Sequence, residues 1–225
     1  LVAIFLDLSN AFDKMWNGGA LKYLADIGIK GRMLKWLASF LSSRKIQVRW
    51  NGHKSEIVEL VNGCPQGSVL SPIIFSVFMN TLHDEIKKLN GPINGIDRLP
   101  CEKAELSQFV DDSATWVTSK SPQLAVKRAQ KTLDCIQNWS NKFGFKINPA
   151  KTQVLIVHKH MRKAPEDVID FPKLTINNQE LQYNKTAKFL GMIFDKYLTW
   201  KEHIDSLIKR CNKDCQLLRV VKGNS

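Results

Sequence analysis

Two short segments of this chain carry aspartates in positions where metal chemistry is expected. Asp7 lies in the run Phe5–Leu8, and Asp111 and Asp112 end the run Phe109–Asp112. Both runs are typical of β-strands, and an ionised carboxylate in such a strand is costly unless a cation or hydrogen bonds compensate it. If the fold brings the two strands side by side, their aspartates form an acidic cluster suited to hard divalent cations such as Mg²⁺.

Each acidic segment alone has an ordinary structural explanation. Asp7 fits a helix-capping or turn carboxylate, and the Asp111-Asp112 pair fits a polar hairpin turn. The net charge of +12, with a pI of about 9.5, instead indicates a polyanionic partner, either nucleic acid or an anionic membrane face. A solubilising basic surface is the plainer interpretation of that charge. An acidic metal site on a basic chain is best explained by phosphoryl transfer on nucleic acid.

The composition bounds the kind of protein. With 225 residues, 44% of them hydrophobic, the chain can fold as one large domain or one and a half small ones. Its five cysteines form no recognisable disulfide or zinc pattern, so we expect reduced thiols in an intracellular protein. No apolar stretch is long enough to span a bilayer, so no membrane partner is expected. Because the chain opens without Met on a hydrophobic strand, we expect an excerpt of a longer protein.

Periodicity and turn residues predict the elements that must position the aspartates. Their order suggests an α+β fold in which helices cover one side of an antiparallel sheet. Asn51-Gly52 predicts a tight hairpin turn, a second hairpin turns at 111–113, and the Gly/Pro-rich segment 62–68 is a loop. The predicted strands cover residues 1–8, 46–50, 56–61, 106–110, 114–118, 154–157, 174–178 and 189–194, and the predicted helices cover 19–28, 32–41, 73–82, 122–144 and 200–221.

Five segments, in this order, resemble the catalytic motifs of reverse transcriptases: Phe5–Asp13, Pro65–Pro72, Phe109–Asp112, Gly144–Thr152 and Lys188–Gly191. They span nearly the whole chain. The segment after the fifth motif, 198–204, is similar to that of non-LTR (LINE-type), jockey-like retrotransposons. The resemblance implies a polymerase palm with partial fingers over residues 1–195, lacking the N-terminal fingers, and the start of a thumb or connection helix over 196–225.

The resemblance implies a role for each matching residue. Asp7, Asp111 and Asp112 are expected to be catalytic and, with the backbone carbonyl of Leu8, to hold the metal. The residues expected to bind the incoming nucleotide are Leu8, Asn10, Ala11, Phe12, Gln66, Gly67 and Lys151, and those expected to contact nucleic acid are Lys45, Arg49, Pro65, Phe189, Leu190 and Gly191. Further candidate phosphate contacts are Lys54, Lys201, Lys209, Arg210 and Lys213.

Some of these roles compete with plainer ones. Phe12 is expected to exclude a 2′-hydroxyl from the sugar site, but it also fits a core ring between a strand and a helix. Lys151 is expected to assist the leaving pyrophosphate, but it fits a solvated surface lysine. The segment 66–67 fits an ordinary turn, and 189–191 fits an apolar core strand. The chain departs from the family where Phe109-Val110 replaces Tyr-Ala or Phe-Ala, and where Cys64 replaces a small aliphatic residue.

The resemblance therefore implies an RNA-directed DNA polymerase. It would join a dNTP to the 3′-hydroxyl of a DNA primer on an RNA template, using two Mg²⁺ ions or Mn²⁺ in their place, during target-primed retrotransposition. A parent protein with an endonuclease domain is implied, located in the nucleus as a ribonucleoprotein and also in the cytoplasm. The isolated excerpt is expected to polymerise poorly. The alternatives are a group II intron maturase-type palm and a decayed or co-opted remnant that only binds RNA.

Overall fold

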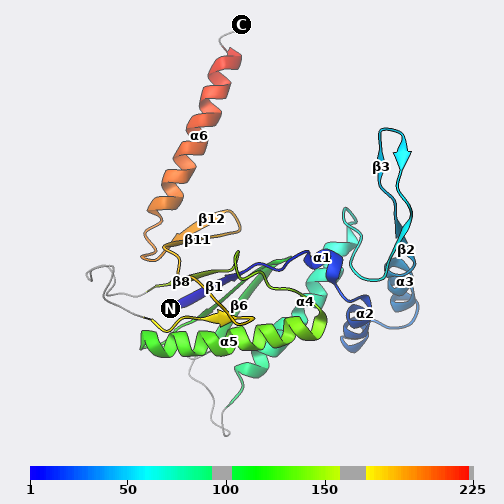
Figure 1. Cartoon of the computed structure of the whole chain (residues 1–225), viewed down its shortest axis with the longest axis horizontal. Coiled ribbons are helices and arrows are strands. Elements are labelled where there is room, and N and C mark those ends of the chain that lie inside the picture. Colours follow the sequence, from blue (N-terminus) through cyan, green and yellow to red (C-terminus); the bar gives the residue numbers. More distant parts are fainter. Residues whose placement is uncertain (93–102, 158–170, 223–225) are drawn as a thin grey trace.

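The centre of the protein is a four-stranded antiparallel sheet with the strand order β6-β7-β1-β8 (Figure 1). The computed structural model describes residues 1–92, 103–157 and 171–222. The strands of this sheet are β1 (Val2–Leu6), β6 (Ala104–Phe109), β7 (Asp112–Val117) and β8 (Gln153–Ile156). The predicted α+β class, with an antiparallel sheet covered by helices on one side, is confirmed.

The sheet buries a different set of side chains on each face. Along β1, Val2, Ile4 and Leu6 belong to the large core shared with helices α4 (Leu70–Leu89) and α5 (Pro122–Phe143), while Ala3 and Phe5 belong to a smaller core on the opposite face. This alternation follows from the two-residue period of a strand. Full burial of each large side chain contributes roughly 1.5–3 kcal/mol.

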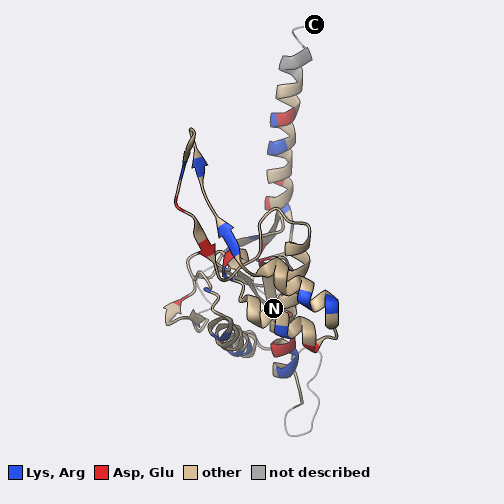
Figure 2. Cartoon of the chain, turned by 90° about the vertical axis from the view of Figure 1, so that its right-hand side faces the viewer, with Lys and Arg blue, Asp and Glu red and all other residues tan. Residues whose placement is uncertain are grey.

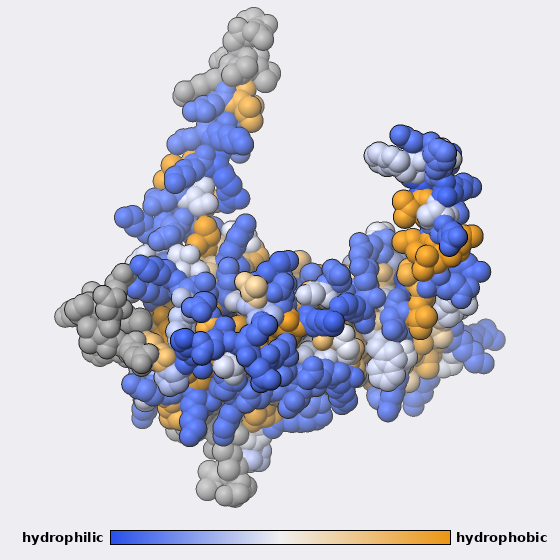
Figure 3. Space-filling view, viewed as in Figure 1, coloured by the Kyte–Doolittle hydropathy of each residue, from blue (hydrophilic) through white to orange (hydrophobic). Residues whose placement is uncertain are grey.

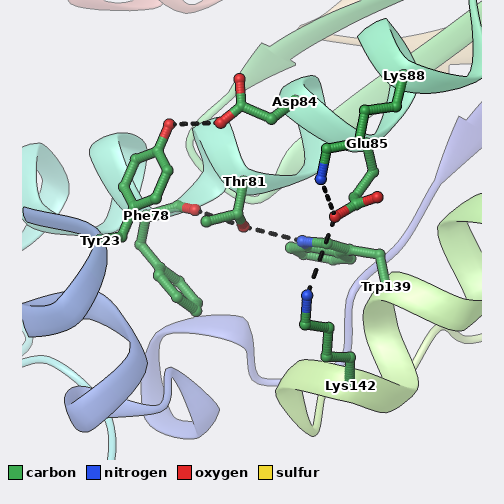
Figure 4. A network of polar contacts seen from close by, with 8 residues as sticks. All are labelled: Tyr23, Phe78, Thr81, Asp84, Glu85, Lys88, Trp139 and Lys142. Atoms are coloured by element: carbon green, nitrogen blue, oxygen red, sulfur yellow. Dashed lines mark hydrogen bonds and ion pairs between the residues drawn. The ribbon is translucent and has the colours of Figure 1, made fainter. Parts of the chain in front are cut away.

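Polar contacts join the helices of the large core (Figure 4). The Trp139 indole donates a hydrogen bond to the Thr81 hydroxyl at 2.9 Å, which satisfies its N–H inside the core. Tyr23 of α2 (Asn17–Asp26) donates to Asp84 of α4 at 2.8 Å, and burial together with this carboxylate raises the pKa of Tyr23 to about 12. The phenol therefore stays protonated and donating at neutral pH.

The opposite face of the sheet is covered by a hairpin of β11 (Thr186–Phe189) and β12 (Met192–Asp195). The Phe5 ring lies 5.6 Å from that of Phe189 and 5.7 Å from that of Phe194. A single strand over 189–194 was the expectation, and it is wrong. Leu190 and Gly191 have φ of 48° and 79°, so they form a tight turn of the kind that favours hairpins.

A ribbon of paired short strands stands clear of the rest of the molecule (Figure 1). It follows α3 (Gly31–Leu41) and consists of β2 (Arg44–Ile46) paired with β5 (Val58–Leu60), and β3 (Arg49–Trp50) paired with β4 (His53–Lys54). The predicted turn at Asn51-Gly52 is confirmed, because both residues are left-handed, with φ of 45° and 82°.

The remaining elements are short, apart from the last helix. They are α1 (Ala11–Lys14), β9 (Thr175–Ile176), β10 (Gln179–Glu180) and α6 (Lys201–Lys222). Helix α6 and the ribbon rise from the same side of the body, with a hollow between them (Figure 3). In the part of the chain that the structure describes, no helix combines the length and apolarity needed to cross a bilayer.

Asp195 organises the turn that leads into α6. Its buried carboxylate accepts hydrogen bonds from the backbone N–H groups of Tyr197, Thr199 and Trp200, at 2.8–2.9 Å. Burial acts to raise the Asp195 pKa, but these hydrogen bonds outweigh it and hold the pKa below its ordinary value. The ionised carboxylate is therefore the form that stabilises the fold.

We expect Asp195→Asn to lower the free energy of unfolding by about 2 kcal/mol at pH 7, because an amide cannot accept on both sides. Since the folded pKa is depressed, this stabilisation is present above the ordinary aspartate pKa of about 3.9 and is lost as the pH falls through the folded value. Urea unfolding from pH 7 to 3 should show the two proteins converging in acid. Asp205→Asn, at an exposed position of α6, is the control. A difference that does not vary with pH would contradict this role.

Candidate active site

The pairing of β1 with β7 brings the two acidic segments together. Val2 pairs with Val117 and Leu6 with Ser113, so one further step of this register sets Asp7 opposite Asp112. Because Leu6 faces the helices, Asp7 and Asp112 face the opposite side of the sheet, which is the side of the hollow. Asp7, which directly follows β1, and Asp112, the first residue of β7, therefore lie at the same edge of the sheet.

Asp111 lies in the turn beside them. Phe109 pairs with Asp112, so the turn consists of Val110 and Asp111, and the predicted turn over 111–113 is wrong because Asp112 already belongs to β7. Val110 has φ of 58°, which is unfavourable for a β-branched residue. Strained backbone of this kind persists where the surrounding structure over-determines it, and here the paired strands hold the turn that carries Asp111.

The pKa of Asp112 responds to the charges of the two other aspartates. Partial burial raises the Asp112 pKa, and the negative charges of Asp111 and Asp7 raise it further. The charges of Asp7 and Asp111 therefore oppose ionisation of Asp112, and a divalent cation between the carboxylates would relieve this repulsion. This donor set fits a hard cation.

Within the described residues, no three His, Cys, Asp or Glu side chains form a group ready to hold a metal. Mg²⁺ is usually bound by one or two carboxylates together with substrate phosphates and water, so a complete protein cage is not required. The Leu8 carbonyl is a further oxygen. Leu8 bridges Ile147, but the hydrogen bonds of that bridge involve Asp7 and Ser9, the neighbours of Leu8.

The loop after α5 places a cation beside the acids. Gly144 ends α5 in the left-handed conformation, with φ of 75°, and the Asn148 carbonyl accepts hydrogen bonds from the N–H groups of Lys151 and Thr152. The Lys151 ammonium lies 4.0 Å from Asp7 Oδ2 and is 68% exposed. An exposed ion pair at this distance contributes at most about 1 kcal/mol to the stability of the fold. Lys151 thus supplies an exposed positive charge at the acidic edge.

The second predicted motif docks onto the first. The N–H groups of Gly63 and Cys64 donate to the carbonyls of Met15 and Phe12, at 2.8 and 2.9 Å. Gly63 has φ of 88°, and a Cβ there would lie 2.7 Å from the Asp13 carbonyl oxygen, so only glycine fits. This contact fixes the loop 62–68 beside α1.

Arg44, which was not predicted, and Cys64 complete this junction. Arg44 donates to the carbonyls of Leu41, Asn62 and Gly63, which ties the ribbon to the loop. Cys64 is buried, and burial raises its pKa to about 11, so its thiol packs in the core and stays protonated. The departure from the family at this position is a packing change.

Asp13 orients Gln66, a role that was not predicted. The Gln66 Nε2 atom donates to Asp13 Oδ1 at 2.9 Å. A carboxylate only accepts hydrogen bonds, so the amide nitrogen must face Asp13 and the amide oxygen faces away. The position of Asp13, directly after Phe12 in the first motif, was the available signal. A cavity of about 850 Å³ adjoins the pair, and its lining includes Arg44 and Pro65.

Phe12 is held in place by a ring stacked against one of its faces. It stacks on the buried Phe75 ring at 4.5 Å with an interplanar angle of 17°, and it remains only partly buried. Its neighbours Asn10 and Ala11 begin α1, where Asn10 adopts a left-handed conformation, with φ of 51°. Gly67 also needs positive φ, of 84°, and has open space around it.

The predicted nucleic-acid contacts lie on separate elements. Lys45 and Arg49 belong to the ribbon, where Lys45 forms an exposed ion pair of 3.4 Å with Glu59. The Pro65 carbonyl accepts from the Ser71 hydroxyl at 2.6 Å, in the docked loop. Phe189 packs on Phe5 near the acidic edge, while the turn residues 190–191 lie at the tip of their hairpin. The structure does not gather these groups into one contact patch.

A sequence model described as "Reverse transcriptase (RNA-dependent DNA polymerase)" matches residues 1–194. The chain belongs to this family. It is 29% identical over 206 residues to "RNA-directed DNA polymerase from mobile element jockey" of Drosophila melanogaster, a match that covers 92% of the chain and 21% of that relative. The predicted relationship to non-LTR, jockey-like elements is thereby confirmed. The chain spans about a fifth of the length of this curated relative.

Solved structures show the same fold in this reverse transcriptase domain. Apo telomerase from Candida tropicalis, truncated from its C-terminal domain, superposes with a TM-score of 0.57 at 16% identity, covering 89% of this chain and 34% of that one. Telomerase of the same organism in complex with a TWJ fragment of telomeric RNA gives 0.57 at 13% identity, covering 89% and 29%. The predicted polymerase-palm fold is consistent with this likeness. Reverse transcriptases generally use divalent metal ions.

Proposed function

We propose that this domain is the catalytic core of an RNA-directed DNA polymerase of a non-LTR retrotransposon. The main support for this proposal is the β1–β7 register, which sets Asp7 opposite Asp112 beside the turn residue Asp111. In this proposal Asp7 and Asp111, with the Leu8 carbonyl, hold Mg²⁺, and Asp112 adds negative charge to the site. When bound, the metal lowers the pKa of the primer 3′-hydroxyl and stabilises charge on the leaving pyrophosphate.

The surrounding residues bind and orient the reactants. In this proposal the face of Phe12 that is not stacked on Phe75 blocks a 2′-hydroxyl, and Gln66, whose amide nitrogen donates to Asp13, offers its amide oxygen to the nucleotide. Lys151, which lies 4.0 Å from Asp7, would turn to the pyrophosphate and stabilise its charge or protonate it. Asn10, Ala11 and Gly67 would contact the nucleotide through backbone groups.

The partners and setting follow from the proposed reaction. The RNA template and DNA primer would lie in the hollow between the ribbon and α6 (Figure 3), and the dNTP would enter beside loop 62–68. For the parent protein we propose an endonuclease domain that nicks the target, with residence in the nucleus as a ribonucleoprotein and also in the cytoplasm. Residues 1–195 would form the palm and partial fingers, and 196–225 the start of the thumb.

The test is addition of one nucleotide to a DNA primer on an RNA template, with the protein in excess over the duplex so that slow turnover is detected. We expect addition that requires dNTP and Mg²⁺ or Mn²⁺ and stops with a chelator. Binding of RNA without metal binding or nucleotide addition would instead identify a co-opted remnant. Addition only on an RNA of self-splicing intron type would favour the maturase alternative.

We expect Asp13→Ala to raise the KM for dNTP by roughly three- to tenfold with little change in kcat, because one oriented hydrogen bond is worth about 0.5–1.5 kcal/mol. The KM of Asp13→Asn should lie between those of the native chain and Asp13→Ala, because an asparagine can face either end of the Gln66 amide. Steady-state kinetics measure the split, with Asp26→Ala on α2 as control. If Gln66→Ala and Asp13→Ala have additive effects, the proposed orientation is wrong.

A further inference from the structure

The outer half of the ribbon, residues 47–54, has a feature that the proposed reaction leaves unexplained. Trp50 lies next to the Asn51-Gly52 turn, and 76% of its surface is exposed. Tryptophan buries more apolar area than any other side chain when it finds a partner, so its display at a hairpin tip indicates a binding role.

The cross-strand register sorts the side chains of this tip. Arg49 pairs with Lys54, and Trp50 pairs with His53. Partners across a ladder lie on the same face of a ribbon, and neighbours along a strand lie on opposite faces. The tip therefore has a cationic face with Arg49 and Lys54, and an aromatic face with Trp50 and His53.

The distribution of charge indicates what the tip binds. Residues 47–54 include Arg49 and Lys54 but no Asp or Glu, while the acids Glu56 and Glu59 lie nearer the base, where Glu59 pairs with Lys45 at 3.4 Å (Figure 2). A positive, aromatic tip without acids fits a polyanion that carries flat rings.

The ribbon is also held in shape by its own hydrogen bonds. The Ser55 N–H donates to the Val48 carbonyl at 2.9 Å, and the Val48 N–H donates to the Ser55 hydroxyl at 3.0 Å. The Gln47 amide adds a bond to the Ser55 carbonyl at 2.8 Å. These bonds, with the tight turn, give Trp50 a preformed platform, so less ordering entropy is lost when a ligand binds.

We propose that the ribbon tip binds single-stranded RNA, with Trp50 stacked on an unpaired base while Arg49 and Lys54 reach the flanking phosphates around the edge of the ribbon. An indole can stack on a base only where that base is unstacked, and the major groove of an A-form duplex is too narrow for side chains to enter. The proposal rests on the proposed function only in taking RNA as the polyanion.

The test measures binding of the whole chain to a labelled, unstructured single-stranded RNA, in a chelator and without dNTP, so that its outcome does not depend on polymerisation. We expect Trp50→Ala to weaken binding about tenfold, within the range measured for base–aromatic stacking, and to leave the salt dependence unchanged. Trp50→Phe should retain most of the affinity. Arg49→Ala and Lys54→Ala should each lower the slope of log affinity against log salt by about 0.7.

Trp36→Ala is the matched control, because Trp36 is 51% exposed on α3 but lies away from the ribbon tip. Its effect on RNA binding should be small. Unchanged affinity in Trp50→Ala would overturn the proposal. Equal weakening for a blunt RNA–DNA duplex would also overturn it, since stacking on an unpaired base is then not the cause.

Discussion

Asp7→Asn is expected to lower the rate of single-nucleotide addition on the order of a thousandfold or more. A metal clamp on the reacting oxygens supplies several kcal/mol of transition-state stabilisation, and each 1.36 kcal/mol is a factor of ten in rate. An amide is a far weaker ligand for a hard cation than a carboxylate. Asp111→Asn should behave alike, because the turn directs it to the same edge. Single-turnover primer extension measures both.

The same variants should not unfold the protein. Asp7 and Asp111 repel the charge of Asp112, so neutralising either removes repulsion in the absence of metal. We therefore expect the metal-free Tm of Asp111→Asn to be equal to or above that of the native chain, and that of Asp7→Asn, which also loses its exposed pair with Lys151, to stay close to the native value. The Mn²⁺ affinity of both variants, followed by the Mn²⁺ spectrum, should fall. Asp26→Asn, at an exposed position on α2, should change neither property.

Because the pKa of Asp112 is raised, the stability of the metal-free protein and its Mn²⁺ affinity should both depend on pH. For an acid whose folded pKa is raised, the ionised form costs stability, so the metal-free protein becomes less stable as the pH rises through the ordinary and then the folded value. Bound metal favours ionisation, so Mn²⁺ affinity should fall on acidification at a higher pH than for an isolated aspartate. Full activity in Asp7→Asn, or loss of activity explained by unfolding, would refute the metal-site assignment.

Local signals predicted the regular elements well. The Asn51-Gly52 turn and the end of the helix at Gly144 were predicted from residues with a strong left-handed preference. The first strand was predicted from its continuous apolar run, which fits the burial of β1 on both faces of the sheet. The turn at 110–111 was misplaced because a valine there contradicts local preference. The sheet register, which is a property of distant residues, overrides that preference.

The candidate site was predictable as a set of motifs but not as a geometry. Only the β1–β7 register shows that Asp7 faces Asp112, and nothing local to either segment indicates it. The partners Asp13 and Arg44 were missed for the same reason, since their roles depend on a loop far along the chain. Residues 93–102 and 158–170, including Cys101, lie outside the described structure.

Phe12→Val is expected to reduce discrimination against ribonucleotides by roughly ten- to a hundredfold. Forcing a hydroxyl against a fixed ring costs about 1–3 kcal/mol, which removal of the ring would relieve. The stack on Phe75 is what makes the ring a barrier, because it prevents Phe12 from swinging away. The measurement is the ratio of kcat/KM for dNTP and for the matching rNTP, and Phe12→Tyr should keep the native ratio.

A purely structural role for Phe12 makes a different prediction. Phe12→Val would then lower stability by removing contacts with Phe75, and both nucleotides would be used less well in the same proportion. Phe143→Val is the matched control, because this half-buried ring contacts Phe78 at 5.2 Å in the helix layer, away from loop 62–68. It should reduce stability and leave the ratio unchanged. If Phe12→Val matches this control, the ring belongs to the core alone, and sugar selection must come from another contact.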